Sequence, residues 1–181
     1  MSRSVALLRG INVGGRNLVA MPALVDAFRT AGYADVQTLL QSGNVVFTAA
    51  SPATGPALED SLELMLRQAF GIPVLVVVRS AEEFAATIAA APPDHGSDAL
   101  RSDVYFLKQP LTADEVWPQL PELREGVDAI APGPGALYFS RVAAQATKTR
   151  IQRLMALPVF QRMTVRSWGT TTRLMGVLDE G

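Results

Sequence analysis

The feature that most constrains this chain is a segment near its middle, residues 91–98 (APPDHGSD), because the order of the expected elements repeats on either side of it. Paired prolines followed by a glycine interrupt both helices and strands. On each side the patterns predict strand, helix, strand, strand, helix and strand, then a trailing helix. We therefore predict an α+β protein of two tandem ferredoxin-like (α-β plait) subdomains, each βαββαβ plus a trailing helix, over residues 1–92 and 97–181. One larger mixed sheet is the alternative.

In the first half, short apolar or β-branched runs predict strands at residues 4–9, 36–41, 45–48 and 74–78. Pro22 and Pro56 are favoured at the first position of a helix, and each begins a segment with apolar residues on one helical face. Ser80 and Glu83 have the spacing of a capping box, which predicts a third helix.

In the second half, strands are expected at residues 103–107, 127–131, 136–140 and 163–166. A second capping box, Thr112 with Glu115, predicts a helix that Pro118 shortens or kinks. Residues 132–135 (PGPG) predict a hairpin turn. A helix is expected around Ile151, and a last one from about Trp168 or Thr170 to Leu178.

Two polar stretches follow the first two predicted strands, residues 9–17 (RGINVGGRN) and 41–44 (QSGN). Because the crossover between these strands makes them parallel, both stretches are expected at the same end of the first sheet. The predicted ligand-binding residues are Arg9, Asn12, Gly14, Gly15, Arg16, Asn17, Gln41, Ser42 and Asn44, with Arg166 and Trp168 from the C-terminal segment.

Glycine backbone, arginine and side-chain amides together suit a phosphate, a carboxylate or a polar base edge. The hypothesis is therefore a small anionic or nucleotide-like ligand. In the alternative interpretation the glycines only form turns and the asparagines only cap the backbone. Residues 10–17 also approach the spacing of a P-loop, but Asn17 replaces the magnesium-binding hydroxyl and the helix begins only at Pro22, so we reject an ATPase.

Composition excludes several kinds of chemistry. The 181 residues include no cysteine and one histidine, so the sequence indicates neither a disulfide, a thiolate nucleophile nor a transition-metal site. His95 is interpreted as a solvated residue of the central segment. Acidic pairs such as Glu59 and Asp60 are interpreted as first-turn residues that favour the helix dipole. A metal-independent group-transfer or hydrolytic enzyme stays an alternative without identified catalytic residues, and no cofactor or oligomeric state is indicated.

Charge is distributed unevenly along the chain. Residues 51–140 contain thirteen acidic and five basic side chains, whereas residues 141–178 contain seven basic and no acidic ones. This basic segment predicts either contact with nucleic acid or neutralisation of acidic groups within the fold. Trp168 beside Arg166 could stack on a base, or anchor the last helix by packing. No apolar run is long enough for a membrane span, and we expect a cytoplasmic protein without membrane contact.

Residues 9–17, 41–47 (QSGNVVF) and 164–168 (TVRSW) resemble a bacterial family known as domain of unknown function 1697, over the full length of the chain. The resemblance implies two packed α–β plait subdomains and no established activity. The chain departs from the family pattern at Ser167, where the family usually has asparagine. Residues 91–96 also replace an Asn-Pro-Phe-like segment.

Overall fold

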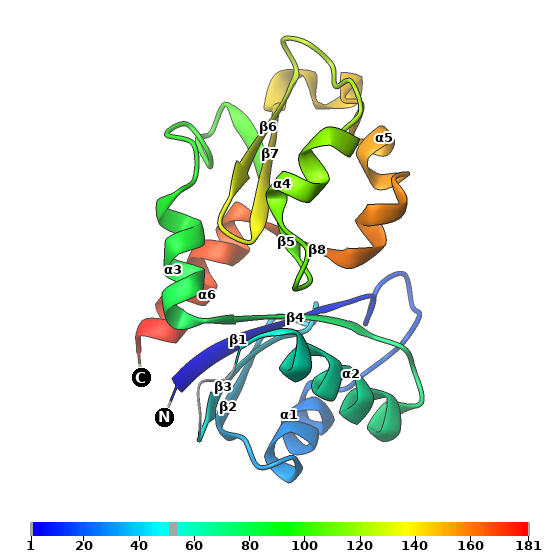
Figure 1. Cartoon of the computed structure of the whole chain (residues 1–181), viewed down its shortest axis with the longest axis vertical. Coiled ribbons are helices and arrows are strands. Elements are labelled where there is room, and N and C mark those ends of the chain that lie inside the picture. The colour runs from blue at the N-terminus through cyan, green and yellow to red at the C-terminus, as the bar shows by residue number, and fades with distance from the viewer. Residues whose placement is uncertain (1, 51–53, 181) are drawn as a thin grey trace.

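The computed structural model describes residues 2–50 and 54–180, and each half of the chain forms one sheet with helices beside it (Figure 1). The first half contains β1 (Ser2–Arg9), α1 (Met21–Thr30), β2 (Ala34–Leu39), β3 (Asn44–Ala49), α2 (Pro56–Phe70), β4 (Leu75–Ser80) and α3 (Ala81–Ala89). The second half contains β5 (Leu100–Leu107), α4 (Ala113–Val116), η1 (Trp117–Gln119), β6 (Asp128–Gly133), β7 (Ala136–Val142), η2 (Ala143–Lys148), α5 (Ile151–Met155), η3 (Pro158–Arg162), β8 (Met163–Ser167) and α6 (Trp168–Asp179).

Both sheets have four strands that are antiparallel to their neighbours, in the orders β2-β3-β1-β4 and β6-β7-β5-β8. The predicted α+β class is confirmed, and two sheets are found rather than one large one. Because β1 and β2 are both antiparallel to β3, they run parallel to each other. The loop after β1 and the turn after β2 therefore leave the sheet at the same end, which is where the two polar stretches were expected.

Local signals placed most helix starts correctly. Ser80 and Thr112 both accept a hydrogen bond from the backbone N–H three residues later, and both capping boxes are complete. Helix α4 has only four residues before a 3₁₀ turn that contains Pro118, because proline has no N–H to continue the helix. Ser167 caps α6 by accepting from the Thr170 N–H at 3.2 Å. Serine and asparagine are both good N-caps, so this departure from the family pattern keeps the cap.

The described residues form three apolar clusters in the core. The first lies between sheet one and the helices α1 and α2, and the second lies between sheet two and α4, α5 and η3. The third contains residues of both halves, including Val5, Val77 and Phe84 from the first and Phe106 and Tyr138 from the second. Helices α3 and α6 contact each other and border this shared cluster (Figure 1). The interior between the halves is therefore continuous hydrophobic core.

Two interpretations of charged or polar residues were wrong or incomplete. His95 is 8% exposed, with its ring 4.9 Å from the Trp168 ring and 5.5 Å from the Tyr138 ring, so it is not solvated. The central segment folds back on itself through backbone hydrogen bonds such as His95 N to Pro92 O at 2.9 Å. Glu59 does lie in the first turn of α2, but it is fully buried against β4.

Among the described residues, none of the helices combines the length and the apolar character that crossing a bilayer requires.

Candidate functional site

The loop after β1 is a tight turn held by its own backbone. Val13 and Arg16 pair as an isolated antiparallel bridge, and the Arg16 N–H donates to the Val13 carbonyl at 3.1 Å. Gly14 and Gly15 at the tip both have positive φ, 58° and 73°, which is the requirement of a type I′ turn. The turn places Gly14, Gly15 and Arg16 in solvent beside Val13, which is 65% exposed.

Asn12 joins the two polar stretches. Its side-chain amide donates to the carbonyls of Gln41 and Val19, each at 2.9 Å, and its side-chain oxygen accepts from the Val19 N–H at 2.8 Å. Asn17 donates in the same way to the Gly10 carbonyl at 2.8 Å. The predicted convergence of the stretches is thus confirmed, and the side-chain amides of Asn12 and Asn17 both have partners within the protein.

Arg166 links the second half of the chain to the first through hydrogen bonds. It is 7% exposed and donates to the side-chain oxygen of Asn44 and to the carbonyls of Leu8 (2.7 Å), Ser42 (3.1 Å) and Gly43 (3.3 Å). Burial lowers the pKa of Arg166 to about 10. A guanidinium has five N–H donors and no acceptor, so a set of carbonyl oxygens is a suitable environment for it.

Arg9 makes the reciprocal contact from the first half to the second. Its guanidinium donates to the carbonyls of Phe160 and Met163, and its Cζ atom lies 4.6 Å from the centre of the Phe160 ring. Burial lowers the pKa of Arg9. Arg9 and Arg166 therefore have internal partners, and the predicted site residues left exposed are Gly14, Gly15, Arg16, Asn17, Gln41 and Ser42.

Trp168 occupies a packing position at the start of α6. Its ring lies against His95, and a Cβ atom on Gly96 would be 2.1 Å from its Cδ1 atom. Gly96 is therefore required for this close approach.

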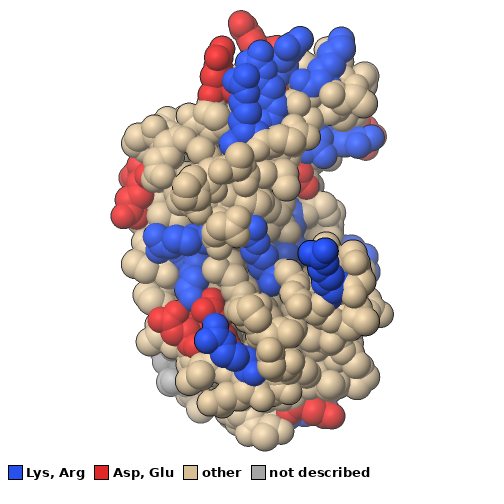
Figure 2. Space-filling model, turned by 90° about the vertical axis from the view of Figure 1, so that its right-hand side faces the viewer, with Lys and Arg blue, Asp and Glu red and all other residues tan. Residues whose placement is uncertain are grey.

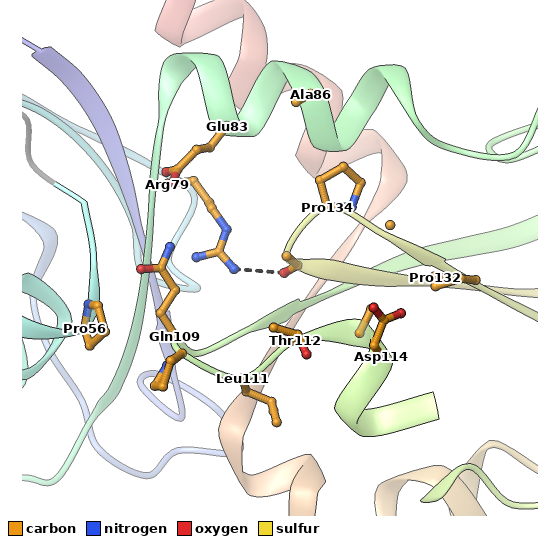
Figure 3. A pocket seen from close by; sticks show the side chains of 14 residues that line it. Pro56, Arg79, Glu83, Ala86, Gln109, Leu111, Thr112, Asp114, Pro132 and Pro134 are labelled. Atoms are coloured by element: carbon orange, nitrogen blue, oxygen red, sulfur yellow. Dashed lines mark hydrogen bonds between the residues drawn. The ribbon is translucent and has the colours of Figure 1, made fainter. Parts of the chain in front are cut away.

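A pocket of about 640 Å³ lies where the two halves meet. Its lining residues are Pro56, Arg79, Glu83 and Ala86 from the first half, and Gln109–Asp114 and Pro132–Gly135 from the second. Figure 3 shows Arg79, Glu83 and Gln109 on one side of the pocket and Asp114 and Pro134 across from them. The pocket was missed in the sequence because its lining comes from four segments that are far apart in the chain, and no local pattern connects them.

A third arginine, Arg79, lies at the base of the pocket and connects the two halves. Arg79 is 2% exposed and donates to the carbonyls of Leu107 (2.6 Å) and Gly135 (2.8 Å) across the junction. Its Nη1 atom lies 3.5 Å from Oε1 of the buried Glu59. An arginine at the end of a run of valines is the one sequence signal of this buried pair, because such strands rarely contain an unpaired charge.

Glu59 connects the same elements through backbone groups. Its carboxylate accepts from the Val78 N–H on β4 and from the Gln109 N–H of the second half, each at 2.9 Å. Burial raises the pKa of Glu59 to about 7, although these two hydrogen bonds and Arg79 oppose the rise. Lys108, next to Gln109, pairs with Asp60 at 2.8 Å and Glu63 at 2.6 Å, which adds a further link between the halves.

Within the described part of the chain, no three His, Asp or Glu side chains are grouped so that they could hold a metal ion.

The fold and these contacts define a class: an α+β protein whose two four-stranded sheets are joined by buried or half-buried arginines that donate to carbonyls across the junction. The chain belongs to the family described as "Protein of unknown function (DUF1697)", whose model matches residues 1–138. It is similar in structure to a conserved bacterial protein, SP0830 from Streptococcus pneumoniae, with a TM-score of 0.86 and 25% sequence identity over 98% of both chains. No curated protein matches the chain.

Proposed function

We propose that this protein binds a small, uncharged or cationic polar molecule in the pocket between its halves. The observation that carries the proposal is the pocket itself, about 640 Å³ with walls from both halves. Binding pockets for small molecules have this size and often lie at the junction of two structural units.

The charges of the lining favour such a ligand over an anion. Among the described lining residues, Arg79, Glu83 and Asp114 are the only charged ones; Glu83 lies on the same side of the pocket as Arg79 and Asp114 lies across from them (Figure 3). Arg79 lies 3.5 Å from Glu59 and also interacts with Glu83, so the carboxylates of the pocket and its base outnumber the single cation. An anion would therefore meet two carboxylates without a free cation beside them.

Two polar groups of the pocket are available to a ligand. In the described part of the chain the Gln109 side-chain amide has no hydrogen-bond partner, and Glu83 uses only Oε2, which accepts from the Ser80 N–H at 2.9 Å. Pro56, Pro110, Pro132 and Pro134 supply rigid apolar walls. The combination suits a flat heterocycle with hydrogen-bond donors.

The predicted ligand site in residues 9–17 and 41–44 stays a rival proposal. Arg16 is its remaining exposed cation, since Arg9 and Arg166 donate to carbonyls. A group-transfer or hydrolytic reaction stays a weaker alternative, because the proposal above requires binding only. A cytoplasmic location also stays a prediction.

We also infer that each half is a ferredoxin-like unit and that the two are a tandem duplication. The support is the shared strand order, with the first strand of each half between its third and fourth strands. The broken helix between β7 and β8 is the main difference between the halves.

The test is a thermal-shift and calorimetry screen with nucleobases, nucleosides and spermidine against nucleotides and sugar phosphates. Glu83→Gln removes the pocket carboxylate and keeps a residue that can complete the capping box. Glu82→Gln is the matched control, an exposed acid of the same turn that does not line the pocket. Gln109→Ala removes the free amide, and Arg16→Ala tests the rival site.

We expect a nucleobase, nucleoside or amine to raise the unfolding temperature of the wild type and of Glu82→Gln and Arg16→Ala. The affinity of the same probe for Glu83→Gln and for Gln109→Ala should be lower than for wild type by a factor of about ten or more. A probe that binds Glu83→Gln as tightly as wild type but fails with Arg16→Ala would contradict the proposal and support the rival loop site.

A further inference from the structure

A second hollow, of about 340 Å³, lies at the end of the second half, away from the junction. It is bounded by β5, β7 and the segment that contains η2 and α5. Its polar lining includes Arg101, Arg141, Thr147 and Gln152, and no acidic side chain lines it among the described residues. Figure 2 shows Lys and Arg side chains gathered at this end of the molecule, with some acidic side chains beside them.

Two arginines of this hollow are held side by side. Arg101 on β5 and Arg141 on β7 are direct partners in the antiparallel register. Side chains of directly opposite residues project from the same face of a sheet, with Cβ atoms about 5 Å apart. Like charges in this arrangement repel each other and destabilise the pair. An anion between them would reverse that effect.

The nearby carboxylates do not neutralise both arginines. Asp103 pairs with Arg141 at 3.7 Å. Asp128 on β6 lies opposite Arg141 in the register, and its carboxylate accepts from the Thr149 hydroxyl and from the backbone N–H groups of Arg150 and Arg124. Arg101 is exposed and has no ion-pair partner in the described part of the chain.

We propose that this hollow binds a phosphate group, with Arg101 as the principal cation and Arg141 beside it. A guanidinium matches phosphate oxygens with two parallel N–H donors, and the side chains of Thr147 and Gln152 provide further donors. Lys148 and Arg150 flank the hollow in sequence and add positive charge. The phosphate comes either from a small phosphorylated molecule or from the backbone of a single-stranded nucleic acid.

The test compares wild type with Arg101→Gln, and with Arg173→Gln as a control that removes an exposed arginine from α6. Affinity for inorganic phosphate and for single-stranded oligouridylate is measured by calorimetry and fluorescence anisotropy. Unfolding temperatures are measured in phosphate and in chloride of equal ionic strength. Oligouridylate binding is repeated between low and moderate salt, because phosphate contacts weaken as salt rises.

We expect phosphate to stabilise wild type and Arg173→Gln and to bind Arg101→Gln about tenfold more weakly. In chloride, Arg101→Gln should be at least as stable as wild type, because the repulsion is removed; a merely structural arginine would give the opposite result. Salt-sensitive oligouridylate binding that needs Arg101 identifies nucleic acid as the source, and a response to phosphate alone identifies a small molecule. The proposal is overturned if neither phosphate nor oligouridylate binds wild type, or if whichever of them binds does so as tightly to Arg101→Gln as to wild type.

Discussion

At the scale of single residues, two glycines of the polar stretches have different roles. Gly43 has a φ of +81°, and a Cβ atom there would lie 2.7 Å from Leu8 Cβ and 2.8 Å from Ile11 Cδ1, both in the buried core. Gly14 has a φ of +58°, and no atom would lie within 4 Å of its Cβ. Only the backbone conformation requires glycine at position 14, whereas packing also requires it at position 43.

We therefore expect Gly14→Ala to lower the free energy of unfolding by about 1–2 kcal/mol, the cost of a left-handed conformation. Gly43→Ala should cost about 1–3 kcal/mol more, because the added methyl group overpacks the core. Denaturant unfolding of the two variants measures the difference. Equal losses would show that the contacts of Gly43 do not constrain the fold.

Because of His95, we expect the free energy of unfolding to decrease at acidic pH. Burial lowers its pKa below the usual 6.5, although Asp94 and a hydrogen bond to the Asp103 backbone oppose this. The folded state then resists protonation, so the stability linked to His95 is fully present above pH 6.5 and is lost as pH falls below it. The free energy of unfolding of His95→Phe should fall less than that of wild type between pH 7 and pH 5. The variant should therefore gain stability relative to wild type as the pH is lowered. A difference that stays constant would contradict the prediction.

At the scale of elements, strands and helix starts were predictable because their signals are local. The valines of β4 and the capping boxes at Ser80 and Thr112 act within a few residues of the chain. The burial of Glu59 was not predictable in this way. An acid in a first helical turn has the same local pattern whether it faces water or a neighbouring strand, and the Gln109 N–H that it accepts from is 50 residues away.

We expect the free energy of unfolding to depend on pH also through Glu59, which lies on helix α2. Burial raises the pKa of Glu59 from 4.5 to about 7, because its 3.5 Å separation from Arg79 offsets the loss of hydration only in part. The folded state holds this proton more tightly than the unfolded chain, so the associated stability is full below pH 4.5 and is lost as pH rises through 7. Glu59→Gln should remove this decline, and Glu82→Gln should keep it, in unfolding measurements between pH 5 and 8.

At the scale of the whole molecule, the two halves share one cluster of buried apolar residues and three bridging arginines. We expect a fragment of residues 1–96 not to fold cooperatively, because it would expose that cluster and leave Arg79 without its carbonyl partners. Circular dichroism and thermal melting of the fragment measure this. A cooperative transition like that of the full chain would show that the first half is an independent domain.

The sequence indicated where polar residues gather, but it did not indicate what Arg9 and Arg166 contact. Their partners are mainly backbone carbonyls, which any residue provides and which therefore leave no pattern in the sequence. Exposed arginines beside glycines and asparagines have the same composition as an anion site. Only the three-dimensional arrangement distinguishes a junction between halves from a site for a ligand.

The most direct test of this account is the stability of Arg166→Lys, with Arg16→Lys as the control in the same polar region. Lysine keeps the charge of Arg166 but cannot reach the same set of carbonyls, so we predict a loss of about 3 kcal/mol or more in the free energy of unfolding. Arg16 is exposed, so its replacement should change that energy by about 0.5 kcal/mol or less. Equal stability of Arg166→Lys and wild type would contradict the role of Arg166 in joining the halves.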